Sequence, residues 1–507
     1  MAHQRAGSSL SSKLPEKNNK ENISHPSQIF SNLKHIYSHC PVFNMKICFD
    51  FVCDEALIYS RAALALQRKG HDVCAITLGN RWKEGWTDQI DLFPLDLEDS
   101  PIDWDKELDR IKQEYSSAVA GFIQADRFIA YLGRDEQMKL LVWTFLKIEE
   151  LVAAGVTKFF ITGVAYLYNL VMVEVARKNN LVCYSLYGTR QKESRFTLSE
   201  GYGGKWDLVD KIYAENLENK EKIDYSAEAN EVIDFRIKFS SPDYMASARQ
   251  TGGISSVFVR EFFHRLKNWY FNNWSKKEDY ITQHPLWYAK RNLKRIINGK
   301  YLKFVFKFDS VNYDDKYYIY PLHLQPEAST LVLGPDYVNQ LETIKAISRR
   351  LPLGEYLYVK EHPAAYGMHS HKMYQEIQQL FNVKLIAPGE DTKRVINNSQ
   401  GVIVISGTMG WEAFLAGKPA LVLGDVFYDQ FPGVYKISNI EQIRSLFNSN
   451  LKVAEVDDIA IALNAIYKGS FKGMFDVHKL DTAQIVLSEE NLSALEEGIL
   501  KIVEYSK

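Results

Sequence analysis

Hydrophobic and polar residues alternate in blocks along most of this chain. Residues 46–51 and 72–78 are apolar runs that predict strands, and residues 60–69 between them have a helical pattern that ends at Gly70. The same succession of strand, helix and strand returns at 156–163, 168–178 and 181–186. This alternation predicts a first Rossmann-like domain.

A second series of alternating blocks begins near Tyr317. Strand and helix patterns follow one another at 317–321, 336–350, 357–362, 370–381, 383–388, 391–399 and 401–424. Two such series predict an α/β protein with two doubly wound domains that face a central cleft, with ligands at the carboxyl ends of the strands. We place the first domain at 45–250, the second at 311–480 and a C-terminal helix at 481–507.

Residues 401–424, GVIVISGTMGWEAFLAGKPALVLG, form the most distinctive block. The apolar run at 402–405 predicts a parallel strand that is buried on both faces. Ser406, Gly407 and Thr408 follow it, at the point where a helix would expose unpaired amides and the positive end of its dipole. The pattern therefore predicts an anion-binding turn between a strand and a helix.

The helix after this turn carries an acid near its N-terminus. Trp411, Phe414 and Leu415 recur at helical spacing and should face the sheet. Glu412 projects from another part of the helix surface, where its carboxylate would accept hydrogen bonds from two sugar hydroxyls. The alternative is that Thr408 only caps the helix and that Glu412 only stabilises the helix dipole.

Composition limits the class of protein. The 507 residues are too many for one ordinary core and indicate two domains with appendages. Contents of 46% hydrophobic and 24% charged residues are typical of a soluble globular protein, and a formal net charge of -2 gives no reason to expect a nucleic-acid partner. The five cysteines lack the spacing of a zinc site or a disulfide framework, so we expect a cytoplasmic protein. We expect residues 1–44, which are polar and without periodicity, to be a disordered extension.

The stretch between the two series has a different composition. In residues 251–310, lysines and arginines outnumber acids, and aromatic residues lie among them. We expect linker helices whose aromatic side chains pack on both domains while the basic side chains are solvated. The alternative is a peripheral contact of residues 254–308 with anionic lipid, or with a lipid-linked acceptor, at the inner face of the cytoplasmic membrane.

Polar residues follow two strands of the second series. Lys360 and His362 end one predicted strand, and His323 and Glu327 follow the strand before it. Because parallel strands bring their carboxyl ends to one edge of a sheet, these loops should open beside Ser406. An imidazole at that edge can donate to a phosphate or protonate a leaving phosphate, which makes His362 a catalytic candidate and Lys360 a donor-binding candidate.

Three segments resemble a known family. PLHLQPEAST, YVKEHP and SGTMGWEAFLAGKPALVLGDVFYD resemble the C-terminal domain of bacterial capsule and surface-polysaccharide biosynthesis proteins, a group that includes the Kdo transferases of capsule assembly. The resemblance covers residues 317–430. It implies a GT-B glycosyltransferase, in which two Rossmann-like domains hold a nucleotide-sugar donor and no metal or other cofactor is required.

The resemblance also implies roles for individual residues. In related CMP-sugar transferases, the His of an HP motif and a Ser/Thr motif contact the nucleotide phosphate, which would assign these contacts to His362, Ser406 and Thr408. Many GT-B enzymes have a Gly-x-Glu-Ala helix whose acid binds the donor ribose. This motif begins here at Gly410, so the resemblance implies ribose binding by Glu412.

Glycosyl transfer also needs a carboxylate that acts as a base, or as a nucleophile at the anomeric carbon. The candidates are Glu55, with its neighbour Asp54 in the loop after the first strand, Asp126, and Glu327. The alternatives are a structural ion pair between Asp126 and Arg127, and a helix cap for Glu327.

Two further pairs of charged residues are relevant to ligand binding. Arg190 and Arg195, in the segment GTRQKESRF, are candidates for binding a carboxylate of the acceptor or the donor, and the alternative is that both are solvated loop residues. Asp314 and Asp315 precede a predicted strand instead of following it. We therefore expect no metal site there and activity without a divalent ion.

The sequence thus predicts a glycosyltransferase that moves a sugar from a nucleotide-activated donor, with CMP-Kdo as the first guess, to a growing surface polysaccharide or a lipid-linked glycan. Two alternatives stay open. A nucleotide-sugar 2-epimerase can share this architecture and would act without an acceptor. A non-catalytic polysaccharide assembly or export protein would bind glycan but no nucleotide.

Overall fold

The computed structural model describes residues 45–52, 56–79, 89–98, 100–115, 119–191, 194–238, 259–260, 262–263, 265–267, 269–270, 280–281, 285–474 and 486–505. The chain from Asn44 to Lys507 forms one compact unit. The expected disordered extension at 1–44 lies outside the described residues. The candidate carboxylate Glu55 and its neighbour Asp54 also lie outside them.

The first half of the chain forms a seven-stranded sheet in the order β13-β6-β5-β4-β1-β2-β3. β6 and β13 are antiparallel to their neighbours, and the other strands pair in parallel, in the order that begins a Rossmann fold. The strands are β1 (Lys46–Asp50), β2 (Asp72–Thr77), β3 (Asp91–Pro94), β4 (Val156–Ile161), β5 (Val182–Gly188), β6 (Arg195–Glu200) and β13 (Phe471–Lys472). The predicted strands β1, β2, β4 and β5 are confirmed, whereas β3 and the antiparallel β6 were not expected.

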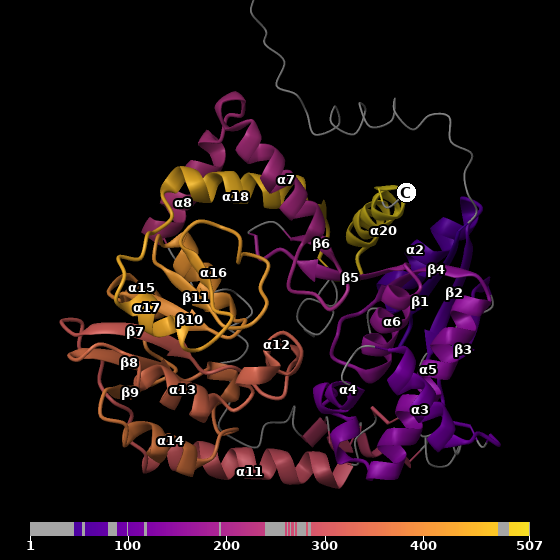
Figure 1. The fold of residues 1–507 in the computed structure, drawn as a ribbon, viewed down its shortest axis with the longest axis horizontal. Helices are drawn as coiled ribbons and strands as arrows, with labels where there is room; N and C mark the ends of the chain where they lie inside the picture. The colour runs from indigo at the N-terminus through magenta and orange to yellow at the C-terminus, as the bar shows by residue number, and fades with distance from the viewer. Residues whose placement is uncertain are drawn as a thin grey trace, which may run out of the picture. The chain divides into compact units, whose positions relative to one another are not determined.

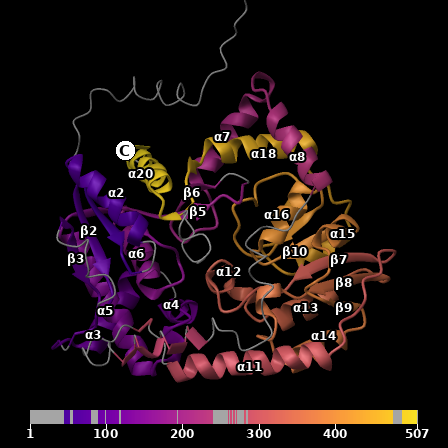
Figure 2. The same ribbon diagram turned by 180° about the vertical axis from the view of Figure 1, so that it is seen from behind.

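Helices cover both faces of this sheet (Figures 1 and 2). Ile47 and Phe49 of β1 pack in one cluster with residues of α2 and α20, and Cys48 packs on the opposite face with residues of α5 and α6. This alternation is that of a strand buried on both faces. The helices are α2 (Ala56–Arg68), α3 (Trp104–Glu114), α4 (Val119–Ala125), η2 (Ile129–Tyr131), α5 (Arg134–Ala153), α6 (Leu167–Lys178) and α20 (Glu489–Tyr505).

The second sheet has six parallel strands in the order β12-β11-β10-β7-β8-β9. This is the full Rossmann order, so the predicted fold class of two Rossmann-like, doubly wound domains of the GT-B type is confirmed. The strands are β7 (Lys316–Pro321), β8 (Glu355–Lys360), β9 (Val383–Ile386), β10 (Gly401–Val404), β11 (Ala420–Val422) and β12 (Val434–Lys436). The helical elements are α12 (Ala328–Leu331), η4 (Pro335–Tyr337), α13 (Gln340–Ser348), η5 (Pro363–Ala365), α14 (His371–Gln378), α15 (Thr392–Asn397), α16 (Thr408–Leu415), α17 (Gln442–Phe447) and α18 (Val456–Lys468).

The chain crosses between the two sheets more often than the sequence indicated. The crossing elements are α7 (Asp207–Glu218), η3 (Lys220–Lys222) and α8 (Ser226–Lys238). Val209 and Val232 share a core cluster with β10 and α18, and Asn216 Nδ2 donates to Asn464 Oδ1 at 3.1 Å. The chain later returns to the first sheet through β13 and α20. Residues 207–238 therefore pack with the second sheet, although the linear range 45–250 assigned them to the first domain.

A single long helix, α11 (Pro285–Phe304), contacts both halves of the protein. The ring of Trp287 lies 4.5 Å from that of Tyr131, which follows α4 in the first half. Arg295, near the middle of α11, donates to Ala364 O at 2.7 Å in the second half. Figures 1 and 2 show one end of α11 beside α14. Part of the expected linker at 251–310 lies outside the described residues.

The block at 401–424 folds as predicted into β10, α16 and β11. The buried side chains of Trp411, Phe414 and Leu415 pack in one cluster with β10. Gly410 lets α16 approach the sheet, because a Cβ at this position would overlap the hydroxyl of Tyr428 and lie 2.9 Å from Val404 Cγ2. Gly410 therefore has a packing role, and its expected place in the donor site stays a prediction.

We predict that Gly410→Ala lowers the free energy of unfolding by about 1–3 kcal/mol, because the added methyl group overpacks the contact between helix and sheet. Urea denaturation measures this change. The matched control is Gly121→Ala in α4, where a Cβ meets no atom within 4 Å and alanine should stabilise the helix by up to about 1 kcal/mol. Equal stability of wild type and Gly410→Ala would contradict the packing role.

Candidate functional site

The carboxyl ends of three neighbouring strands, β10, β7 and β8, bring the predicted loops of the second domain together. His323 follows β7, and its backbone N–H donates to Gln340 Oε1 at 2.7 Å while its carbonyl accepts from Gln340 Nε2 at 3.0 Å. Gln340 Nε2 also donates to Gln325 Oε1 at 2.9 Å. The side chain of Gln340 thus holds the loop after β7 at the edge where β8 and β10 end.

The turn after β10 is partly occupied by this loop. The backbone N–H of Ser406 donates to His323 Nε2 at 3.3 Å, and Ser406 Oγ donates to Ser329 O at 2.5 Å. Burial lowers the pKa of His323 to about 4, which keeps its imidazole neutral and able to accept. Ser406 therefore organises the turn, and the structure does not leave it to contact a phosphate directly.

Two amides at the N-terminus of α16 are available to a ligand. Gly407 occupies the N-cap position and Thr408 is the first helical residue, so Thr408 is not the cap that one interpretation expected. In the described part of the chain, no group accepts a hydrogen bond from the amides of Gly407 or Met409. These amides lie at the positive end of the helix dipole, which is an arrangement that suits an anion.

At the strand end Lys360–His362, the side chain of Glu361 has structural partners, whereas that of His362 keeps a donor group for a ligand. The buried carboxylate of Glu361 accepts from the backbone N–H of His362 at 2.6 Å and from the hydroxyl of Tyr374. His362 Nδ1 accepts from Ala364 N at 3.1 Å, which leaves the proton of the neutral ring on Nε2. Burial lowers the pKa of His362, so at neutral pH this side chain offers an uncharged N–H donor.

Glu412 and Lys360 lie within electrostatic range of each other. Lys360 is buried and its ammonium group donates to Pro388 O at 2.8 Å. Burial raises the pKa of Glu412 to about 7, and the positive charge of Lys360 acts in the opposite direction. In the described residues the Glu412 carboxylate accepts no hydrogen bond, so hydroxyl donors of a ligand would favour its ionised form.

Glu327 lies at the start of α12, but its side chain does not cap that helix. Ser329 Oγ donates to Glu327 Oε2 at 3.4 Å, and Ser329 also accepts from Ser406, which links Glu327 to the turn after β10. Burial raises the pKa of Glu327, and the charges of Arg127 and Arg190 lower it. Glu327 is therefore the candidate carboxylate that the structure brings to the site.

Asp126 is a structural acid. Its buried carboxylate accepts from the backbone N–H groups of Phe128 at 2.7 Å, Ile129 at 3.2 Å and Leu167 at 2.8 Å. Asp126 forms no ion pair with Arg127 within the described residues. Both interpretations of Asp126, as a catalytic group and as half of an ion pair, are therefore corrected: the carboxylate ties the turn after α4 to the N-terminus of α6.

The two candidate arginines differ. Arg195 donates to Ser470 Oγ at 2.8 Å, Ser470 O at 2.7 Å and Tyr467 O at 2.9 Å, so it joins β6 to the end of α18 and does not bind a carboxylate. Arg190 is exposed, has a left-handed backbone with φ of 63°, and acts electrostatically on Glu327. Arg190 therefore stays near the site and Arg195 does not.

Asp315 has structural partners at the opposite end of β7. It accepts from Tyr358 Oη at 2.6 Å and from Asn312 Nδ2 at 2.8 Å, and it pairs with Lys384 Nζ at 2.5 Å. These three groups hold the Asp315 carboxylate at the end of β7 away from the candidate site.

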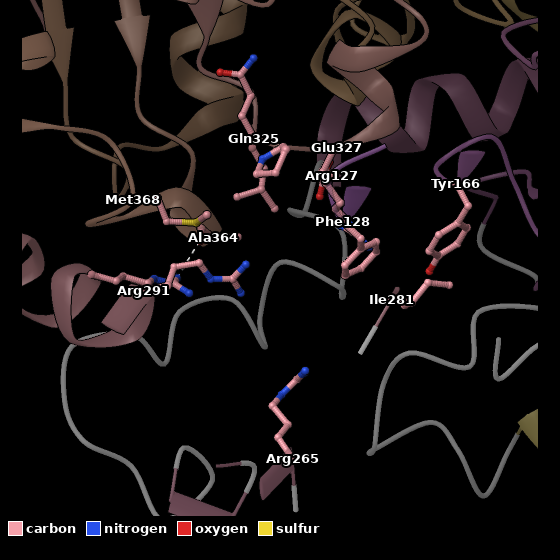
Figure 3. A pocket seen from close by; sticks show the side chains of 13 residues that line it. Arg127, Phe128, Tyr166, Arg265, Ile281, Arg291, Gln325, Glu327, Ala364 and Met368 are labelled. Atoms are coloured by element: carbon pink, nitrogen blue, oxygen red, sulfur yellow. Dashed lines mark hydrogen bonds between the residues drawn. The ribbon is translucent and has the colours of Figure 1, made fainter. Parts of the chain in front are cut away.

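A pocket of about 590 Å³ opens beside Glu327 (Figure 3). Its lining includes Arg127, Arg291 and Arg295, none of which the sequence placed at a site. Arg291 and Arg295 are four residues apart and so lie on one face of α11. The sequence shows this spacing, but because lysines surround both arginines, the whole stretch was predicted to be a solvated basic surface.

These features define a protein with two Rossmann-like domains, in which polar side chains and, within the described residues, unpartnered helix amides of the second domain gather at one sheet edge. Residues 228–455 match the family model described as capsule polysaccharide biosynthesis protein. This match covers less than half of the chain and lies in the family that the sequence resembled. A comparison with curated proteins gives no match. No helix in the described part of the chain has the length and apolar character needed to cross a membrane.

Several solved structures are similar to this chain at low identity. Thermosulfurimonas dismutans KpsC, beta Kdo 2,7 transferase, is 13% identical with a TM-score of 0.30, over 74% of this chain and 98% of that one. Methanocaldococcus jannaschii UDP-GlcNAc 2-epimerase, in complex with UDP-GlcNAc and UDP, is 11% identical with a TM-score of 0.26, over 84% and 100%. Anabaena Alr3699/HepE, in complex with UDP-glucose, is 11% identical with a TM-score of 0.28, over 91% and 100%. Similarity at this level does not distinguish between activities.

We predict that Glu412 makes the stability of the protein depend on pH. Its pKa in the folded chain, about 7, lies above its ordinary value of 4.5, so the folded state binds the proton more tightly. The free energy of unfolding of wild type, relative to that of Glu412→Gln, should fall as the pH rises from about 4.5 to 7 and stay constant above that. Urea denaturation of both proteins across this range measures the difference. Parallel pH profiles would contradict the assignment.

Proposed function

We propose that this protein is a glycosyltransferase of surface-polysaccharide synthesis that transfers a sugar from a nucleotide-activated donor to a glycan or lipid-linked acceptor. The observation that carries the proposal is the convergence of Lys360, His362, Gly407 and Glu412 at one sheet edge, beside a pocket that contains Glu327. The match of residues 228–455 to a family model of capsule polysaccharide biosynthesis proteins supports the same function.

In this proposal the donor phosphate binds at the N-terminus of α16. The free amides of Gly407 and Met409 and the Nε2–H of His362 donate to the phosphate and stabilise the charge that develops as the glycosidic C–O bond breaks. The Glu412 carboxylate accepts from the ribose hydroxyls. CMP-Kdo is the first donor to test.

Glu327 then acts as the general base. The acceptor hydroxyl attacks the anomeric carbon, its proton passes to the Glu327 carboxylate, and the bonding electrons of the broken C–O bond leave with the phosphate. Burial raises the pKa of Glu327 above its ordinary value, which favours this role. These steps need no divalent ion, so we propose activity in excess EDTA.

The decisive assay incubates the protein with CMP-, UDP- and GDP-sugars in EDTA, with and without a glycan acceptor, and follows products by mass spectrometry. The proposal requires a product that contains both sugars and forms only when acceptor is present. An altered nucleotide sugar without acceptor would indicate a 2-epimerase instead. Glycan binding without nucleotide binding would indicate an assembly or export protein.

We predict that Glu412→Ala and Glu327→Gln separate binding from catalysis. Loss of hydrogen bonds to a charged group should weaken nucleotide affinity about 10- to 100-fold in Glu412→Ala. Glu327→Gln should lower kcat about 100-fold or more with nucleotide affinity unchanged, because it removes only the base. Calorimetry and initial rates measure the two effects, and Glu342→Gln, an exposed acid on α13, is the matched control. The same response in both variants would contradict the assigned roles.

We also propose that the enzyme works at the inner face of the cytoplasmic membrane through the outer face of α11. Leu293, Ile297 and Phe304 on this face are 54%, 59% and 75% exposed. Residues 285–308 contain no acid but many basic residues: Lys290, Arg291, Lys294, Arg295, Lys300, Lys303 and Lys307. Exposed apolar side chains at helical spacing among lysines suit the surface of an anionic bilayer.

We predict that the protein sediments with phosphatidylglycerol-containing vesicles but not with phosphatidylcholine vesicles. Lys294→Gln should weaken binding about fivefold, which corresponds to about 1 kcal/mol for one lysine. Phe304→Ser should weaken binding as well, while Leu353→Ser, which changes a still more exposed apolar residue before β8, should not. Equal binding to both vesicle types, or unchanged binding by both α11 variants, would contradict a membrane role for α11.

A further inference from the structure

The lining of the pocket beside Glu327 contains more positive than negative side chains. Figure 3 shows Arg127, Arg291 and Glu327 around it, with the side chain of Arg265 reaching toward the same space. Its complete lining is Arg127, Phe128, Tyr166, Arg265, Ile281, Arg291, Arg295, Leu324, Gln325, Pro326, Glu327, Ala364 and Met368. Four arginines therefore face a single carboxylate in a space of about 590 Å³, which is the size of a small-ligand site.

Three of these arginines contact aromatic rings or backbone carbonyls and form no close ion pair among the described residues. Arg127 lies over the ring of Phe128 at 5.0 Å, and its Nε is buried without a hydrogen-bond partner. Arg291 lies over the ring of Trp287 at 5.0 Å, and Arg295 donates to backbone carbonyls. In the described part of the chain, none of the three forms an ion pair with a carboxylate.

The arginines also repel one another. Burial lowers the pKa of Arg291, and the charges of Arg265 and Arg127 lower it further. Burial and the charge of Arg291 lower the pKa of Arg295 in the same way. A bound anion would relieve this repulsion, because its negative charge would lie among four positive charges in a partly desolvated space.

The surrounding structure fixes two of the arginines in place. The buried carboxylate of Asp126 holds the turn that presents Arg127, through its hydrogen bonds to the amides of Phe128 and Ile129. The guanidinium group of Arg295 is held by Tyr366 O at 3.2 Å and Ala364 O at 2.7 Å. Positive groups that are held before a ligand arrives lose little entropy on binding it.

We propose that this arginine pocket binds a carboxylate or phosphate group carried by the acceptor, and that the enzyme therefore selects an anionic acceptor. The assignment rests on the proposed function, because it takes Glu327 in the same pocket as the base that deprotonates the acceptor hydroxyl. The donor phosphate has its own site at α16, so the arginines are left for the second substrate. Their planar guanidinium groups match a carboxylate or phosphate in two-point hydrogen bonding.

The first test measures binding alone, which keeps it independent of turnover. Calorimetry of the full chain with trigalacturonate and with inorganic phosphate should show binding to wild type, and uncharged galactotriose should not bind. Arg127→Gln should weaken the binding of the anions about 10- to 100-fold, which is the loss expected for charged hydrogen bonds. Arg127→Lys keeps the charge but loses the two-point geometry, and should weaken binding less.

The matched control is Arg177→Gln, which removes an exposed arginine of α6 that pairs with Glu174. Circular dichroism and urea denaturation of each variant exclude loss of the fold as the cause. Failure of wild type to bind either anion, or equal binding by wild type and Arg127→Gln, would overturn the proposal even if the protein transfers sugars.

The second test uses initial rates with an anionic acceptor, once a donor is known. Arg127→Gln and Arg291→Gln should raise KM for the acceptor about 10- to 100-fold and leave KM for the donor unchanged. A higher KM for the donor with an unchanged KM for the acceptor would assign the pocket to a carboxylate of the donor sugar and overturn the proposal. Absence of any transfer by wild type, with the anion binding intact, would count against the proposed function and not against the pocket.

Discussion

The parallel pairing of β7 with β8 and β10 is the constraint on which the candidate site depends. In this register Pro321 lies beside Lys360 and Ile319 lies beside Val402, so all three strands end at one edge of the sheet. Because parallel strands must be connected through helices, the residues that follow each strand enter a helix or loop at the same edge. The groups that we propose to bind a nucleotide phosphate therefore meet there, and no single loop supplies them all.

Buried polar side chains fix the geometry of this edge. Glu361 holds His362, Gln340 holds the loop that begins at His323, and Asp126 holds the turn that presents Arg127. Each of these groups has its hydrogen-bond partners inside the protein, as a buried polar group requires. Some polar side chains of the loops thus position the site. Others, such as Glu327 and Glu412, have carboxylates that we propose to contact a ligand.

The alternation of apolar strands and helical patterns was sufficient to predict both Rossmann-like sheets, because strands buried on both faces leave a strong signal in the sequence. It also predicted the turn after β10 and the approach of Lys360 and His362 to it. It did not distinguish Asp126 and Arg195 from the residues that gather at the candidate site. Their partners, Leu167 and Ser470, are far away in the sequence, and only the folded chain shows that these charges are already satisfied.

The arginine pocket was missed for the related reason that its members come from α11 and from loops of both halves of the chain. Arg127 lies in the first half of the chain and Arg295 lies in the helix that leads to the second half. In the sequence, each has the surroundings of an ordinary solvated arginine. The basic stretch around α11 thus contains two surfaces, one that faces the pocket and one that faces outward, which composition alone could not separate.

A crystal structure of the protein with CMP tests the central claim most directly. The account predicts that the phosphate lies within hydrogen-bond distance of the amides of Gly407 and Met409 and that the ribose hydroxyls donate to Glu412. A nucleotide bound elsewhere, with His323 and Ser329 still closing the turn after β10, would contradict it.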